Sequence, residues 1–188
     1  MLKRMFPDAN WISGTYLHCH NPRLERKWVE VTVDTQLDAL IEAVKQGFRS
    51  DMLDYGAGVS RTMVFANTVE AAEAVAKILG RAGIECFRYH KDSSLEEHVS
   101  HVIQADFATS AVDFLHRVGR TARAGQHGLV TSLFTESNRD LVDAIRQAEK
   151  LGQPVETAFS RKRSFRNKLK KRGYSKLIDK STAALTSA

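Results

Sequence analysis

Three basic side chains in the segment 111–123 have the types and spacing that suit phosphate chemistry. On a helical wheel, His116, Arg120 and Arg123 fall within about 60° of one another. The apolar positions of the same segment lie on nearly the opposite side: Ala111, Leu115, Val118 and Ala122. Guanidinium groups bind phosphate oxygens bidentately, so this stripe predicts a site that grips a polyphosphate or stabilises its transition-state charge. A solvated basic helix face is the alternative interpretation.

The elements expected around this stripe alternate between strand and helix. Apolar runs and period-two alternation predict strands at 27–33, 62–66, 85–90, 101–106 and 129–134. Helical periodicity and capping residues predict helices at 37–47, 68–82 and 110–123, another beginning at 93–97, and a last one at 137–151. Such alternation is typical of βαβ crossovers. We therefore expect an α/β fold in which helices cover both faces of a parallel sheet.

Asn67 and Thr68 directly follow the strand predicted at 62–66. Ligands of parallel sheets bind outside the carboxyl ends of the strands, which makes both residues candidate ligand contacts. Asn and Thr are also common helix N-caps, and a helix is expected to begin here. The two interpretations carry equal weight, and both stay open at this point.

The positive charge of the chain is concentrated in its last thirty residues. The net charge is +6, yet residues 161–180 contain ten Lys and Arg against one acidic residue. This tail predicts phosphate contacts with RNA, with Phe165 and Tyr174 available for base stacking. The candidate RNA-binding residues are Arg161, Lys162, Arg163, Arg166, Lys168, Lys170 and Lys171. A disordered, solubilising tail is the alternative.

The remaining sequence sets the expected domain limits. The core domain is predicted at 27–158, with 1–26 as a linker or the end of a preceding domain and 159–188 as the basic tail. The two cysteines, Cys19 and Cys86, show no pairing pattern, so we expect reduced thiols. The run His18-Cys19-His20 lacks a second ligand pair at a zinc spacing, and we predict no metal site. No segment has the length or composition of a membrane span, a signal peptide or a transit peptide.

The string HRVGRTARAG at 116–125 resembles motif VI (H-R-x-G-R-x-x-R) of the DEAD-box RNA helicases. Residues 64–68 resemble motif IV, residues 89–94 resemble the beginning of motif IVa, and residues 101–106 resemble the family strand V-x-x-V-I-x-x-D. The resemblance extends over about 27–160 and corresponds to the second RecA-like domain. The tail and the segment 1–33 look most like a plant organellar subgroup, which implies a chloroplast or another organelle.

The resemblance implies a role for each candidate residue. Arg120 and Arg123 would face the γ-phosphate of ATP, and His116 would contact the acidic motif of a first RecA-like domain. Asn67 and Thr68 would lie near the RNA backbone. The family uses ATP with Mg²⁺ to unwind RNA, so the expected partners are RNA and the N-terminal RecA-like domain. We expect a monomer without membrane contact.

The sequence departs from the family pattern in two respects. These 188 residues contain neither a G-x-x-x-x-G-K-[ST] phosphate loop nor an Asp-Glu-Ala-Asp string. Motif V and its strand–helix unit, roughly 25–30 residues, are missing before His101, and Leu95 and His98 replace the Gln and Arg of motif IVa. We therefore expect a sheet without one interior strand, in which strands 62–66 and 101–106 pair directly or the sheet splits.

These departures predict that the chain alone does not hydrolyse ATP. It would be the C-terminal half of a helicase whose activity needs the other half. A non-catalytic RNA-binding module that acts through its basic tail is the second reading, and a truncated product without function is the third.

Overall fold

The computed structural model describes residues 8, 21–51, 61–87, 99–123 and 125–159. Its centre is a sheet of four strands in the order β1-β4-β3-β2, and every neighbouring pair is parallel. The strands are β1 (Leu24–Glu30), β2 (Thr62–Phe65), β3 (His101–Gln104) and β4 (Gly128–Phe134). Strand β3 is buried along its whole length, because it lies inside the sheet and helices cover both faces. The expected parallel α/β fold is confirmed.

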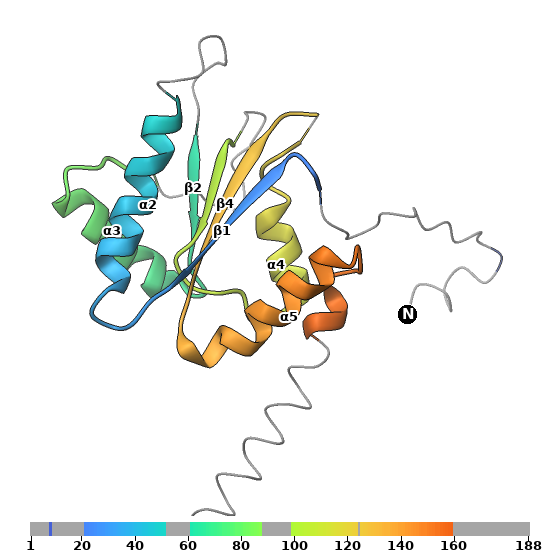
Figure 1. Ribbon diagram of the computed structural model, residues 1–188. Helices are drawn as coiled ribbons and strands as arrows, with labels where there is room; N and C mark the ends of the chain where they lie inside the picture. The colour runs from blue at the N-terminus through green and yellow to red at the C-terminus, as the bar shows by residue number, and fades with distance from the viewer. Residues whose placement is uncertain (1–7, 9–20, 52–60, 88–98, 124, 160–188) are drawn as a thin grey trace, which may run out of the picture.

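Two helices cover each face of the sheet (Figure 1). Helices α2 (Gln36–Asp51) and α3 (Val69–Arg81) pack over a core on one face. Helices α4 (Ala111–Val118) and α5 (Arg139–Lys150), the latter preceded by the 3₁₀ turn η1 (Glu136–Asn138), pack over the other. Neighbouring residues of β3 serve opposite cores, since Val102 packs with Phe114 and Ile145 while Ile103 packs with Leu40.

Strands β2 and β3 pair directly, which is one of the two outcomes expected for a sheet that lacks the motif V strand. Their register runs from Thr62 opposite His101 to Phe65 opposite Gln104. Beyond the strands, the Ala105 amide donates to the carbonyl of Phe65. The sheet therefore does not split at this position.

Several predicted boundaries are wrong. The first strand is Leu24–Glu30 and not 27–33, because the chain turns at Thr32, whose amide donates to Thr35 Oγ1. Val33, the last residue of the predicted strand, is 91% exposed. The strand predicted at 85–90 is not formed over the described residues 85–87. The helix beginning at 93–97 lies outside the described residues.

Two helix termini also differ from prediction. Helix α2 does not stop at Gly47 but continues to Asp51. Helix α5 begins at Arg139, after η1, and not at residue 137, and Asn138 occupies its N-cap position without a capping side-chain bond. Its end before Gly152, which has a φ of 62°, is as expected.

Helix α2 continues through Gly47 because the missing side chain lets it approach the sheet. A Cβ at this position would lie 2.6 Å from Thr62 Oγ1 and 2.8 Å from His101 Nδ1. A glycine at a helix interior usually costs about 0.5–1 kcal/mol relative to alanine. Here the clash with two packed side chains outweighs that cost.

We expect Gly47→Ala to lower the free energy of unfolding by about 1–3 kcal/mol, as overpacked cores do. Gly80→Ala in α3 is the matched control, since no atom lies within 4 Å of its would-be Cβ. That control should gain about 0.5–1 kcal/mol from helix propensity. Urea unfolding of both variants measures the difference, and equal stabilisation of both would contradict the packing argument.

Candidate functional site

Helix α4 is shorter than the predicted helix over 110–123. Ser110 is its N-cap: Ser110 Oγ accepts from the Asp113 amide at 3.1 Å. The helix ends at Val118, with Gly119 as its C-cap. After it, the Thr121 hydroxyl donates to the Ser100 carbonyl at 3.1 Å, which draws the chain toward the start of β3. The φ of Ala122 is 54°, outside the helical region, so Arg120 and Arg123 lie in the turn that follows α4.

The structure nevertheless keeps the three predicted basic side chains close together. Exposed His116 and half-buried Arg120 approach each other, with 3.4 Å between Arg120 Nη2 and His116 Nε2. The exposed Arg123 folds back so that its Nε donates to the Gly119 carbonyl. Within the described residues, neither Arg120 nor Arg123 forms an ion pair with a carboxylate. Their guanidinium groups are therefore able to bind an external anion.

Arg117, between these side chains in sequence, has a different environment that the sequence analysis missed. It is 8% exposed, and its Nη1 donates to the Asp106 carbonyl at 2.9 Å while its Nη2 donates to Asn67 Oδ1 at 2.8 Å. The guanidinium also lies over the Phe65 ring, 5.6 Å from its centroid. Burial lowers the pKa of Arg117, and the nearby Asp113 and Asp106 carboxylates oppose that shift. Its helical-wheel position, about 60° from the inward Phe114, was the available sign of burial.

Asn67 and Thr68 both have partners inside the protein. The Asn67 amide donates to Asp106 Oδ2 at 3.0 Å, and its side-chain Nδ2 donates to the Phe107 carbonyl at 3.1 Å. Thr68 is the N-cap of α3, because its Oγ1 accepts from the Ala71 amide at 3.1 Å. The capping interpretation thus describes Thr68 correctly, and the RNA contact of both residues stays a prediction.

The two sets of candidate residues lie at opposite ends of β3. Thr121, in the turn that carries Arg120, bonds to Ser100 just before β3. Asn67 bonds to Asp106 just after it. The predicted phosphate-binding and RNA-binding residues therefore form two separate sites. Arg117 links the two sites: it lies on α4 next to His116 of the phosphate-binding set, and its side chain bonds to Asn67 of the RNA-binding set.

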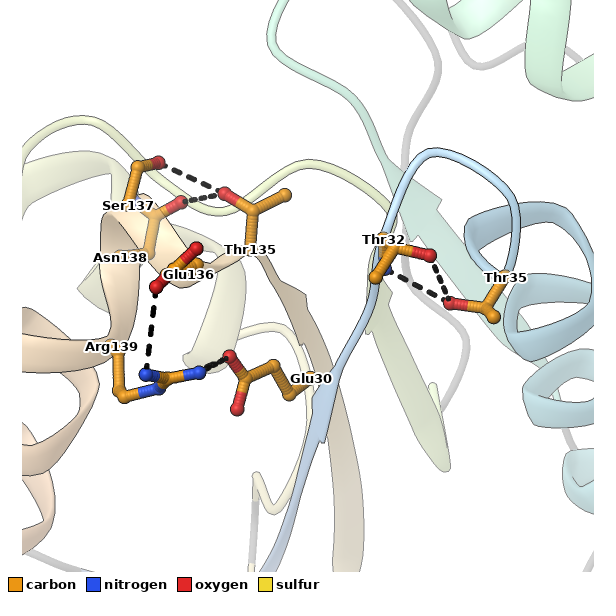
Figure 2. A network of polar contacts seen from close by, with 8 residues as sticks. All are labelled: Glu30, Thr32, Thr35, Thr135, Glu136, Ser137, Asn138 and Arg139. Carbon is orange, nitrogen blue, oxygen red and sulfur yellow. Dashed lines mark hydrogen bonds and ion pairs between the residues drawn. The ribbon is translucent and has the colours of Figure 1, made fainter.

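The carboxyl ends of β1 and β4 carry a polar network that the sequence analysis did not identify. Figure 2 shows Arg139 between Glu30 and Glu136, with its Nη2 2.5 Å from Glu30 Oε1. The hydrogen bond and charge of Glu30 raise the pKa of Arg139. Thr135 Oγ1 lies 2.9 Å from Ser137 Oγ and donates to Asn138 Oδ1. Because these groups satisfy one another, the network fastens η1 to the sheet.

The remaining predictions concern the basic tail, metal binding and membrane spans. The basic-tail residues 161–171 and the run His18-Cys19-His20 lie outside the described residues. Among the described residues, no group of three or more His, Cys, Asp or Glu side chains could hold a metal ion. No helix in the described part of the chain is long and apolar enough to span a bilayer.

Comparison with known proteins gives matches in sequence and in structure. No family model matches the chain. "DEAD-box ATP-dependent RNA helicase 22" of Oryza sativa subsp. japonica is 58% identical over 214 aligned positions, which cover 99% of this chain and 36% of that protein. The protein of the same description from Arabidopsis thaliana is 59% identical over 204 positions, covering 94% and 34%. The chain thus spans about a third of the length of these curated relatives.

Solved structures give the same fold. "S. cerevisiae Dbp5 bound to RNA and ADP BeF3" superposes with a TM-score of 0.62 at 16% identity, covering 84% of this chain and 51% of that one. A DEAD box protein from Methanococcus jannaschii superposes with a TM-score of 0.53 at 20% identity, covering 69% and 41%. At these identities the likeness establishes the RecA-like fold alone.

Proposed function

Because this chain belongs to the DEAD-box RNA helicase family, we propose that it acts as the second RecA-like domain of an ATP-dependent RNA helicase. The observation that carries the proposal is the 58% identity with the rice relative over 99% of the chain. The fold supports it, since a RecA-like sheet with four flanking helices presents basic residues in the turn after α4.

The geometry suits a domain that stabilises phosphate charge from outside. His116, Arg120 and Arg123 lie on or directly after the end of α4, and the two guanidinium groups have no carboxylate partner among the described residues. An arginine placed against a transferring γ-phosphoryl group stabilises its transition-state charge. ATP with Mg²⁺ would be held by the phosphate loop of a first domain, since none of these 188 residues forms such a loop. Arg120 and Arg123 would then complete the site when the two domains close.

RNA is the proposed second ligand. Asn67 and Thr68 at the carboxyl end of β2 would lie near its backbone, and their internal bonds would fix the α3 N-terminus that faces it. The basic tail supports a second candidate function, RNA binding without catalysis, because its charge alone suffices for salt-dependent phosphate contacts. Loss of RNA affinity on removal of residues 161–188 would favour that second function. A chloroplast location stays a prediction from the family resemblance.

The proposal is tested by joining this chain to the part of the rice relative that it does not span. In that complete protein, Arg120→Gln and Arg123→Gln should each lower ATP turnover by about 10³-fold or more, the range measured for arginine fingers. Arg81→Gln, an exposed arginine in the last turn of α3, should leave turnover unchanged. Steady-state phosphate release gives the rates, and circular dichroism confirms that each variant is folded.

Unchanged turnover in both arginine variants would overturn the proposed role. ATP hydrolysis by the 188-residue chain on its own would do the same, because it would require a phosphate-binding loop of another kind.

A further inference from the structure

The residues just before β1 are fixed to the turn that follows α4, although the sequence predicts them as a linker. The side-chain Nδ2 of Asn21 donates to the Ala122 carbonyl at 3.3 Å, and the Gly128 amide donates to the Arg23 carbonyl at 3.0 Å. Within the segment, the Arg23 amide donates to Asn21 Oδ1 at 3.0 Å. These bonds use only main-chain atoms of Arg23, so they hold its backbone in place without engaging its guanidinium.

The guanidinium of Arg23 lies against Gly125 in the same turn. A Cβ at Gly125 would lie only 2.7 Å from Arg23 Nη1, and the φ of Gly125 is 80°, in the left-handed region that favours glycine. The next residue, Gln126, closes the turn, because its amide donates to the Arg123 carbonyl at 3.0 Å. The missing side chain at Gly125 therefore makes room for the Arg23 guanidinium in the turn that carries Arg123.

The turn and the segment before β1 together present three guanidinium groups without a counter-charge. Among the described residues, none of Arg23, Arg120 and Arg123 forms an ion pair with a carboxylate. The sequence contains no Asp or Glu in 21–24 or in 116–128. Like charges gathered in this way repel one another and raise the local concentration of anions. A polyphosphate offers several negative charges in a row, and guanidinium forks bind its oxygens bidentately.

We propose that Arg23 is a third guanidinium of the phosphate-binding site and that it binds the polyphosphate of the nucleotide together with Arg120 and Arg123. The inference rests on the proposed function, which assigns this site to ATP. Arg23 lies beyond Gly125, outside the segment that carries the two arginines proposed to act on the γ-phosphate. We therefore assign it to binding: it holds the phosphates equally in the ground state and in the transition state.

The first experiment titrates the 188-residue chain with sodium tripolyphosphate and follows the backbone amides by NMR. Amides of the turn that follows α4 should shift with a saturable concentration dependence. Arg23→Gln should raise the dissociation constant at these amides by about tenfold or more, the usual effect of losing a hydrogen bond to a charged group. Arg81→Gln removes the same charge from the last turn of α3 and should leave the constant unchanged. The backbone bonds of residue 23 persist in Arg23→Gln, so the variant keeps the fold.

Three results of this titration would overturn the inference. The first is an unchanged dissociation constant in Arg23→Gln, or no saturable shift in the turn at all. The second is an equal loss of affinity in Arg81→Gln, which would mean that only the overall charge of the chain matters. The third comes from a parallel titration with a short single-stranded RNA, the other source of phosphate groups. If Arg23→Gln weakens the binding of RNA at the turn but not the binding of tripolyphosphate, Arg23 belongs to an RNA contact.

A second experiment uses the complete protein, in which this chain is joined to the part of the rice relative that it does not span. Arg23→Gln should raise the KM for ATP by about tenfold and leave kcat unchanged, as expected for the loss of uniform binding. If Arg120→Gln and Arg123→Gln lower turnover while Arg23→Gln changes neither constant, this inference is wrong and the proposed function stands. If neither of those two variants lowers turnover, the proposed function is wrong, and the tripolyphosphate titration still decides whether Arg23 binds phosphate.

Discussion

Glu149→Ala should lower the free energy of unfolding by about 3–5 kcal/mol, because it leaves the guanidinium of Arg26 buried without its counter-charge. Arg26 in β1 and Glu149 in α5 form an ion pair whose side chains are only 8% and 14% exposed. Arg26 also lies over the Phe114 ring, 5.6 Å from its centroid. Burial lowers the pKa of Arg26 to about 10, still far above neutrality, so the unpaired side chain would stay charged. Urea unfolding at pH 7 measures the loss.

Two comparisons separate this effect from a general loss of an ion pair. Glu30→Ala removes the partner of Arg139, but those side chains are 41% and 51% exposed, so we expect little change. The double variant Arg26→Met with Glu149→Leu replaces both charges by apolar groups and should recover most of the stability lost in Glu149→Ala. If Glu149→Ala and Glu30→Ala lower the free energy of unfolding equally, the buried ion pair contributes no more to stability than the exposed one, and the argument is wrong.

The same pair shows what the sequence could not predict. The segment Leu24–Arg26 contains two charged residues in three and lacks clear alternation, so the sequence predicts it as part of a linker or the end of a preceding domain. In the structure it is the first half of β1, because Glu149 neutralises Arg26 from a position 123 residues further along the chain. Local sequence patterns contain no information about such a partner. The apolar strands β2, β3 and β4 were found within a few residues, since their burial needs no polar partner.

The candidate site was predicted in its residue types but not in its local geometry. The helical wheel placed His116 and Arg120 on one face, and these side chains do meet. The wheel failed beyond Val118, because the helix ends at Gly119, Ala122 takes a φ of 54° and the Thr121 hydroxyl bonds to the Ser100 carbonyl. Arg117 was overlooked since charged residues are rarely buried unless paired. Its partners, the Asp106 carbonyl and Asn67, are visible only once α4 is packed on β2 and β3.

A second large effect is expected from pH, through the buried imidazole of His101. This side chain is 2% exposed in the interior of the sheet, with 2.8 Å between its Nε2 and Thr131 Oγ1. Its Nδ1 points toward Gly47 of α2. Burial, with a smaller contribution from the charge of Lys27, lowers the pKa of His101 from 6.5 to about 4. The folded protein therefore keeps the neutral ring under conditions in which the unfolded chain takes up a proton.

The sign of the effect follows from that difference in proton binding. Between pH 6.5 and 4 the unfolded state binds more protons at His101 than the folded state, so stability falls as the pH is lowered through this window. The total loss amounts to about 3 kcal/mol, at 1.36 kcal/mol per unit of pKa. His101→Asn removes the titrating group and keeps a side chain that can bond to Thr131.

The measurement is the free energy of unfolding of both proteins at half-unit steps from pH 7.5 to 4. Carboxylates contribute equally to both curves, so the difference between the curves isolates His101. We expect the wild type to lose about 3 kcal/mol more than the variant over this range. Parallel curves would mean that the His101 ring becomes hydrated or protonated in the folded state. In that case the close packing of α2 at Gly47 against β3 would have to open at low pH. The difference in the free energy of unfolding between Gly47→Ala and Gly80→Ala would then disappear at low pH.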